Sequence, residues 1–490
     1  MHDVAIAGAG PAGSLAALLL ARQGLRVALI GAVSGERRLE GASARTLAIL
    51  NEIGLRGAGV IAIASRHSQW PGLAGALGQE ALIARRMLDR GLYRAALAAG
   101  VEPVRARVLG ADAGAWQSSA GYLSARVLID ARGRRAPAAQ GRLRAPLAIA
   151  IAGAHRADRL PAFAERSADR LPTLTMGAAD GSAALAEQTA DRPAAPTEHG
   201  ADRRIAGLPP AEARAPTALS AWTEVRATPL GWVWRAGWGG HARWTQIVID
   251  AQALSGGAGQ VPALWDRFFA QAEAGQAEPL PGRWRARAAA IHCNPCSLLA
   301  GDPLRIGDAA VAFDPLSGHG LFWALASARM AVPVVHALLD EQTALADGFV
   351  TRRVRDTFLH QARIGRDFHR QAATRFATPF WARRADWPDD EPVRAPLTRP
   401  MVAPRVIVRD HRLVNAEVVC TPQEPDGVAF VRGVEMAPLF HRLHGQSADD
   451  AMRALAACVP GADIELRRFL LGWLLSRGVV RDPRGVGGPA

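Results

Sequence analysis

Two glycine-rich segments lie far apart in the chain and carry the residue types that bind phosphate groups. The first reads GAGPAG at residues 8–13, and the second reads GDAAVAFDPLSGHG at residues 307–320. A GxGxxG turn between a strand and a helix directs backbone N–H groups and the positive end of the helix dipole at an anion. We interpret the second segment as the completion of a ligand site that the first segment begins.

The first segment fits the dinucleotide fingerprint because of the elements around it. A short apolar strand (DVAIA, residues 3–7) precedes it, and an apolar helix and a second strand (LRVALI, residues 25–30) follow. In this βαβ unit, Gly8 allows the tight turn, Gly10 lets the backbone approach a pyrophosphate, and Gly13 allows close packing of helix on strand. The sequence therefore predicts a Rossmann-type opening.

One expected residue of this fingerprint is missing. An acidic residue at the end of the second strand normally binds the ribose hydroxyls, but this chain has Gly31 there. Glu36 and Glu40 come later in the chain, and either could bind the ribose hydroxyls instead. The site for the adenosine half is thus left open, whereas the pyrophosphate site is defined.

Composition places the chain among globular proteins with several domains. Its 490 residues are 49% hydrophobic and 21% charged, which is enough apolar material for a large core. We find no apolar run of the roughly 18–20 residues that a membrane span needs and no signal peptide. These features predict a cytoplasmic protein.

The net charge of +13 comes entirely from arginine, because none of the 58 basic residues is lysine. The arginines are scattered rather than clustered, so we expect no nucleic-acid partner. An acidic protein partner remains an alternative.

Four cysteines are present, and Cys293 and Cys296 form a CNPC motif. This pair is either a redox motif or two reduced thiols beside a loop, and it cannot complete a zinc site alone.

Periodicity and composition predict an α/β fold in four parts. A proline-rich linker at 386–400 separates the last part, and an irregular insertion spans 155–216. The predicted parts are a nucleotide-binding domain at 1–150, an antiparallel-sheet substrate domain containing the insertion at 151–285, a return to the nucleotide-binding domain with long helices at 286–385, and a small winged-helix-like domain at 400–490.

The strand, the GxGxxG turn and the late GD segment together resemble the flavoprotein monooxygenases of the hydroxylase type. The resemblance covers roughly residues 1–345 and implies FAD as cofactor, with NADH or NADPH as electron donor. By this resemblance, Asp308 binds the ribitol chain, and Gly318, Gly320 and Leu321 line the flavin ring. The remaining cofactor-binding residues that it implies are Gly8, Gly10, Ala12, Gly13, Arg45, Arg85 and Pro315.

The chain departs from that family at several positions. Val311 stands where a histidine is usual, and Trp323 or its neighbour where an asparagine is usual. FDPLSGHG resembles a sub-branch between hydroxylases and flavin-dependent halogenases. GWVWRAGW at 231–238 partly resembles a halogenase signature through Trp232 and Trp234, although ordinary sheet packing explains both. Halogenases of this type use a lysine, so a chain without lysine is a poor halogenase.

Oxygen insertion into an aromatic ring is the reaction that the resemblance then implies. Reduced flavin and dioxygen form a C4a-hydroperoxide whose distal oxygen is electrophilic, and the protein must keep it dry and place the ring beside it. Asp314 and His319, on either side of Pro315, are our candidate catalytic residues. The alternatives are a helix-capping aspartate and an ordinary loop histidine.

The C-terminal domain points to a large substrate, because a small phenol would not require it. This sub-branch resembles the flavoproteins of tryptophylquinone biogenesis, which act on quinohemoprotein amine dehydrogenase. The resemblance implies hydroxylation of a tryptophan side chain in a small protein or peptide. The domain is alternatively a dimerisation or lid element. The rival functions are a small-molecule aromatic hydroxylase and a non-catalytic flavoprotein assembly factor.

Overall fold

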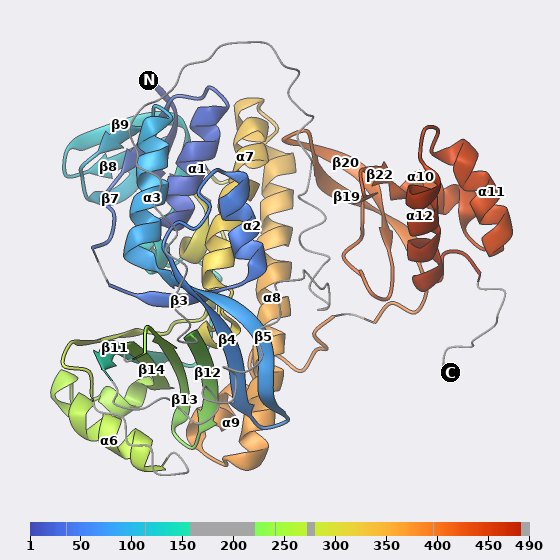
Figure 1. The fold of residues 1–490 in the computed structure, drawn as a ribbon. Helices are drawn as coiled ribbons and strands as arrows, with labels where there is room; N and C mark the ends of the chain where they lie inside the picture. Colours follow the sequence, from blue (N-terminus) through green and yellow to red (C-terminus); the bar gives the residue numbers. More distant parts are fainter. Residues whose placement is uncertain are drawn as a thin grey trace. The chain divides into compact units, whose positions relative to one another are not determined.

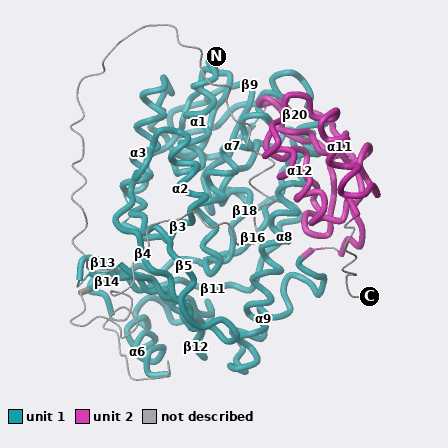
Figure 2. The backbone as a smooth tube through the Cα atoms, turned by 45° about the vertical axis from the view of Figure 1, so that its right-hand side comes forward, with its two compact units in different colours: residues 1–173, 216–393 teal, residues 174–215, 394–490 magenta. Residues whose placement is uncertain are grey.

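A computed structural model describes residues 1–35, 37–112, 114–156, 221–240, 242–271, 280–394 and 396–481. The chain divides into two units, which Figure 2 shows in different colours. The described residues of unit 1 lie within 1–156 and 221–393, and those of unit 2 within 394–481. The insertion predicted at 155–216 lies almost wholly outside the described residues.

The first sheet of unit 1 is the nucleotide-binding sheet that the sequence predicts. Its central strand β1 (His2–Ala7) pairs in parallel with β2 and β9, and Val4 to Ala7 are fully buried. Strands buried on both faces require apolar side chains throughout, as this one has. The other strands are β2 (Val27–Ile30), β6 (Glu102–Val104), β7 (Val108–Asp112), β8 (Ala115–Ser118), β9 (Gly121–Asp130) and β17 (Leu304–Arg305).

Three helices of unit 1 pack together beside this sheet, with α1 between α3 and α7 (Figure 1). The described α-helices of unit 1 are α1 (Pro11–Arg22), α2 (Ala44–Glu52), α3 (Arg85–Ala98), α6 (Val261–Gln271), α7 (Gly320–Leu339), α8 (Thr343–Arg375) and α9 (Pro379–Ala385). Among the described residues, α7 alone is long and apolar enough to cross a membrane, and 72% of its apolar stretch is buried inside the protein. Its apolar side chains therefore belong to the core.

The second sheet of unit 1 has eight strands and forms the lower half of Figure 1. All of its neighbouring strands are antiparallel except β12 and β4, which are parallel. The strands, in sheet order, are β15 (Trp284–Ala288), β11 (Ala148–Arg156), β14 (Ala242–Asp250), β13 (Gly231–Trp238), β12 (Ala221–Thr228), β4 (Val60–Trp70), β5 (Leu73–Ala84) and β3 (Leu39–Ala42). The sequence analysis had not predicted β4 and β5, which come from the first third of the chain.

Both faces of the eight-stranded sheet are buried by helices. On one face, Val233 and Ile247 pack with Trp265 and Phe268 of α6. On the other face, Trp232 packs with Trp381 of α9 and with residues of α8. A small third sheet contains β10 (Leu143–Arg144), β16 (His292–Cys293) and β18 (Val311–Ala312), and β18 lies within the second glycine-rich segment.

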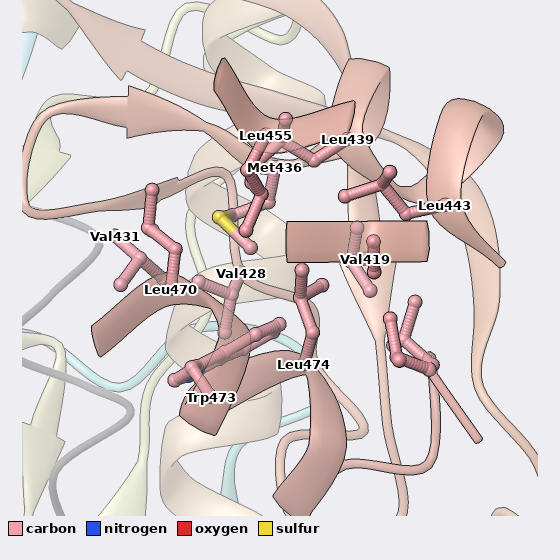
Figure 3. Close-up of a cluster of buried hydrophobic side chains, with 13 residues drawn as sticks. Val419, Val428, Val431, Met436, Leu439, Leu443, Leu455, Leu470, Trp473 and Leu474 are labelled. Carbon is pink, nitrogen blue, oxygen red and sulfur yellow. The ribbon is translucent and has the colours of Figure 1, made fainter. Parts of the chain in front are cut away.

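Unit 2 has a hydrophobic core of its own. Figure 3 shows this core, in which Met436, Leu455 and Trp473 from three helices meet Val419 of the hairpin. Its elements are β19 (Met401–Arg409), β20 (Arg412–Cys420), β21 (Phe430–Val431), β22 (Val434–Glu435), α10 (Met436–Leu443), α11 (Ala448–Cys458) and α12 (Ile464–Ser476). The structure confirms the α/β class, with a Rossmann-type sheet and a second, largely antiparallel sheet, while the winged-helix likeness and the four-part domain division remain predictions.

Candidate functional site

A cavity of about 850 Å³ in unit 1 joins the two glycine-rich segments to the eight-stranded sheet. One part of its wall is the first glycine turn with the end of β2, and another is the segment from Asp308 to Leu321. A third part is one face of the sheet, from β5 through β12 to β14. A single cavity of this shape can hold an elongated ligand with one end against the sheet.

The first glycine turn is held by close backbone contacts. Gly8 has φ +113°, and a Cβ atom there would lie 2.3 Å from the carbonyl oxygen of Ala131. A Cβ atom on Gly13 would lie 1.9 Å from the carbonyl oxygen of Gly8. Gly10 differs, because a Cβ atom there would meet nothing within 4 Å. Gly10 caps α1 and lines the cavity, so its bare backbone faces space that a ligand can fill.

The two glycine-rich segments touch each other directly. A Cβ atom on Gly307, which has φ +57°, would lie 2.8 Å from Cβ of Ala12. The N–H group of Gly307 donates to Ser327 Oγ at 2.8 Å, and its carbonyl accepts from Trp323 Nε1 at 3.2 Å. Both partners belong to α7. Trp323 of α7 thus fixes the second segment against the first.

Asp308 follows this contact and lines the cavity. Its carboxylate lies 3.2 Å from Arg134 Nε, and its carbonyl accepts a hydrogen bond from His292 Nε2 at 3.0 Å. Burial and the nearby Arg142 lower the pKa of His292 to about 4, so this imidazole is neutral near pH 7 and donates its Nε2 proton. The hydrogen bond from His292 therefore fixes the backbone of Asp308, and the carboxylate of Asp308 lies at the cavity wall.

The other residues predicted to bind the cofactor fall into two groups. Ala12, Arg85, Pro315, Gly318, Gly320 and Leu321 line the cavity, whereas Gly13 and Arg45 are not among its lining residues. Gly13 acts through its packing on Gly8, and Arg45 is partly buried in the first turn of α2. The structure brings most of these residues together around one space.

Glu40 lies beside the cavity, whereas Glu36 lies outside the described residues. Glu40 pairs with Arg38 and, at 2.8 Å, with Arg85, which also binds Asp89 at 3.0 Å. Burial alone would raise the pKa of Glu40, but the two arginines hold it below its ordinary value. Glu40 is therefore an anion held by two cations.

Gly31 itself has φ +120°, and Ser34 and Arg107 line the cavity near it.

The cavity wall is strongly cationic. Its lining contains eight arginines but four carboxylates, and this excess of positive charge suits a ligand with a pyrophosphate. The arginines are Arg38, Arg66, Arg85, Arg107, Arg132, Arg134, Arg135 and Arg287. Together with the bare backbone at Gly10, this charge makes the residues present a good fit for FAD.

The sheet supplies an aromatic wall at the other part of the cavity. Trp232 and Trp234 lie two residues apart on β13, and both line the cavity beside Val225 and Gln246. Trp232 is buried against Trp70 and Trp381 in the core, and Trp234 is partly buried. The two tryptophans therefore pack the sheet and also line the cavity, and the likeness of the WxW motif to a halogenase signature stays a prediction.

Asp314 and His319 take different positions. Asp314 lines the cavity, its Oδ1 accepts from the N–H of Leu316 at 2.9 Å, and its Oδ2 lies 3.2 Å from Nε2 of His369 in α8. Burial alone would raise the pKa of Asp314, but the His369 contact lowers it. His319 precedes α7 and is not among the described lining residues. Asp314 also caps the short helix Pro315–Ser317, which was the alternative we considered for it.

The CNPC motif lies in the core rather than at the cavity. Cys293 and Cys296 are free thiols, 4% and 9% exposed. Burial and the neighbouring Cys296 raise the pKa of Cys293 to about 12, which makes it a poor nucleophile. Within the described ranges no cluster of three metal-ligating side chains occurs.

Sequence reasoning missed the residues that β4 and β5 bring to the site. Arg66, His67 and Glu80 line the cavity from these strands, next to Thr223 of β12. The alternation of side chains in VIAIA at 60–64 was a strand signal, but nothing local shows that this hairpin joins a sheet built 150 residues later. That pairing depends on long-range packing.

Comparison with known proteins agrees with this geometry. Residues 1–74 match the FAD binding domain family model. The peptidyl tryptophan dihydroxylase QhpG, essential for tryptophylquinone cofactor biogenesis, is 31% identical, with a TM-score of 0.69 over 98% of this chain and 100% of that one. The flavin-dependent halogenase CmlS is 15% identical, with a TM-score of 0.64 over 100% of this chain and 98% of that one. No curated protein sequence matches the chain.

Fold, cavity and matches together define an FAD-dependent oxidoreductase of the monooxygenase and halogenase class. Within this class, the near-complete match at 31% identity is decisive. The chain belongs to the family of flavoprotein monooxygenases that includes QhpG. The likeness to CmlS, at 15% identity, concerns the fold alone.

Proposed function

We propose that this enzyme hydroxylates a tryptophan side chain within a protein or peptide, as a step in the biogenesis of a peptide-derived quinone cofactor. The observation that carries the proposal is the match to a peptidyl tryptophan dihydroxylase over 98% of this chain, unit 2 included. Coverage of unit 2 does not by itself decide the substrate, because CmlS also covers 100% of this chain; the identity of 31% over that length favours a shared type of substrate.

Bound FAD, once reduced, activates dioxygen and supplies the oxygen atom for the reaction. Asp308, Pro315, Gly318, Gly320 and Leu321 hold the flavin half in this proposal, and the turn at Gly8 to Gly13 holds the pyrophosphate. Gly10 is the residue whose backbone has open space before it. Arg85, which lines the cavity and is held by Glu40 and Asp89, and Arg45 are the further cofactor-binding residues of this proposal.

The enzyme's own residues prepare the substrate end of the cavity. Trp232, Trp234 and Val225 form an apolar wall that excludes water from the reacting ring. Asp314 is an anionic group of the same cavity, and its Oδ2 lies 3.2 Å from Nε2 of His369. It can accept the proton that the ring carbon loses when aromaticity returns, whereas His319 is not among the described lining residues.

The electron donor in this proposal is NADH or NADPH, which reduces the bound flavin directly. Unit 2 recognises the partner polypeptide that carries the target tryptophan, and the arginine excess of the chain, with a net charge of +13, suits an acidic partner. The modification would take place in the cytoplasm. Halogenation is disfavoured, because the chain contains no lysine to carry the halogen to the substrate.

The test is the reaction itself. The holoenzyme is given NADH or NADPH, dioxygen and the partner polypeptide, and the partner is analysed by mass spectrometry. We expect a gain of one or two oxygen atoms on one tryptophan residue. Turnover of free indole or phenol without any modification of the polypeptide would instead support the small-molecule hydroxylase, and binding without NAD(P)H oxidation would support an assembly factor.

A further inference from the structure

Of the four carboxylates in the cavity wall, three have a cationic or histidine partner. Glu40 is paired with arginines, Asp308 with Arg134, and Asp314 with His369. Glu80 of β5 is the exception: within the described part of the chain its partner is a neutral hydroxyl, Thr223 Oγ1, which donates to Oε1 at 2.5 Å. An anion in a partly buried wall costs free energy unless a donor compensates it.

Glu80 is nonetheless held in a defined position. The Thr223 hydroxyl comes from β12, across β4 from Glu80. On the other side lies Gly41 of β3, where a Cβ atom would be 2.2 Å from Oε2 of Glu80. A side chain at position 41 would therefore displace the carboxylate from the position that it has in this structure. Thr223 and Gly41 thus fix a carboxylate whose second oxygen has no cationic partner in the described structure.

The surroundings of Glu80 fit a flat aromatic ring that carries one hydrogen-bond donor. The same wall of the cavity contains Trp234 and Val225, and Thr223 connects them to Glu80 on the strand order β13-β12-β4-β5. We propose that Glu80 accepts the indole N–H of the target tryptophan side chain. This inference rests on the proposed function and specifies how the same site distinguishes indole from other aromatic rings.

The hydrogen bond would favour the reaction as well as binding. When an electrophilic oxygen adds to an indole, positive charge spreads over the ring onto the nitrogen, and its N–H becomes a stronger donor. A carboxylate that already accepts this N–H therefore binds the transition state more tightly than the substrate. Glu80 transfers no proton or electron in this inference, because the N–H bond stays intact throughout.

Ligand binding tests the inference without requiring turnover. The holoenzyme is titrated by calorimetry with three probes: indole, 1-methylindole and benzothiophene. Benzothiophene has a similar bicyclic shape with sulfur in place of N–H, and 1-methylindole has a methyl group in place of the N–H hydrogen. A hydrogen bond to a carboxylate is worth roughly tenfold or more in affinity, so we expect the wild-type protein to bind indole at least about tenfold more tightly than either analogue.

Substitutions then assign that preference to one side chain. Glu80→Leu removes the acceptor and should bind all three probes alike, and Glu80→Gln keeps a neutral acceptor and should fall between. Glu102→Gln is the matched control, since Glu102 lies on the surface with its side chain 61% exposed and paired with His2. It should retain the wild-type preference. No preference in the wild-type protein, or an unchanged preference in Glu80→Leu, would overturn the inference.

A second variant protects the test against misfolding at position 80. Gly41→Ala does not change residue 80, but it puts a methyl group where the Glu80 carboxylate lies. The displaced carboxylate should no longer meet the probe's N–H, so this variant should also reduce the preference for indole. Melting temperatures and flavin occupancy check that each variant is folded. A failure of these binding results is distinguishable from a failure of the proposed function, which is judged by oxygen gain on the partner polypeptide.

Discussion

The carbonyl oxygen of Gly8 lies 1.9 Å from the place where a Cβ atom on Gly13 would stand. This contact closes the turn between β1 and α1, and it depends on glycine at position 13. Gly13→Ala must therefore distort the turn, and we expect loss of FAD together with a lower melting temperature. Absorbance of bound flavin and calorimetric unfolding of the purified variant measure the two effects.

Gly10→Ala is the matched comparison for that variant. A Cβ atom there meets nothing within 4 Å, so the fold should keep its melting temperature while FAD binds less tightly, because the methyl group occupies the ligand's space. An equal loss of stability in both variants would contradict this division of roles. A Gly10→Ala protein with wild-type affinity for FAD would show that the pyrophosphate lies elsewhere.

Asp314 and His369 join the second glycine-rich segment to α8 across 3.2 Å. The side chains of Asp314 and His369 are 11% and 5% exposed, and breaking a buried pair typically costs about 3 kcal/mol. We expect Asp314→Asn to lower the free energy of unfolding by roughly this amount near pH 7. The reason is that the anion of Asp314 is favoured in the folded state, where its pKa is lowered.

The difference in the free energy of unfolding between wild type and Asp314→Asn should depend on pH. A carboxyl whose pKa is lower in the folded protein stabilises the fold above its unfolded pKa of about 4, and this contribution disappears as pH falls further. Denaturant unfolding of wild type and Asp314→Asn should therefore differ most at neutral pH and converge in acid. A gap that widens in acid would contradict the assignment of Asp314 as the anion.

The sequence predicted the nucleotide-binding half of the site much better than the substrate half. Gly8, Gly10 and Asp308 sit in local motifs whose spacing carries their meaning, and the structure places all three around one space. The sequence predicted that the two glycine-rich segments form one ligand site, but it did not predict the packing of Gly307 on Ala12. No local signal specifies packing between two distant turns.

Residues from β4 and β5 illustrate what local patterns could not show. Glu80 reaches the site because its strand pairs with β4, and β4 pairs in parallel with β12, which begins at Ala221. Such pairings are decided by the packing of the whole sheet. His369 lies in the last two turns of α8, one of the long helices that the sequence predicts, but its contact with Asp314 depends on how α8 packs on the second segment.

The thiols of the CNPC motif should be chemically silent in the folded protein. Cys293 is 4% exposed and its pKa is raised to about 12, so little thiolate exists at neutral pH. Ellman's reagent should react with Cys293 and Cys296 only after unfolding. Replacing both with serine should leave NAD(P)H oxidation unchanged. Rapid labelling of either thiol in the native protein would instead favour a redox function.

Removal of residues 394–490 separates the two units. Unit 2 has its own core around Met436, Leu455 and Trp473, and the described cavity is built from unit 1 alone. We expect the shortened protein to keep FAD and to lose modification of the partner polypeptide. Flavin absorbance and partner mass measure these outcomes. Unchanged modification by the shortened protein would show that unit 2 has another role.

The central claim is that this enzyme transfers oxygen from dioxygen to a tryptophan side chain in a polypeptide. The most direct measurement is the reaction under ¹⁸O₂, followed by tandem mass spectrometry of the partner. The account predicts heavy oxygen on one tryptophan residue, dependent on FAD and NAD(P)H. A partner that is bound and consumes NAD(P)H but contains no oxygen from ¹⁸O₂ would contradict it.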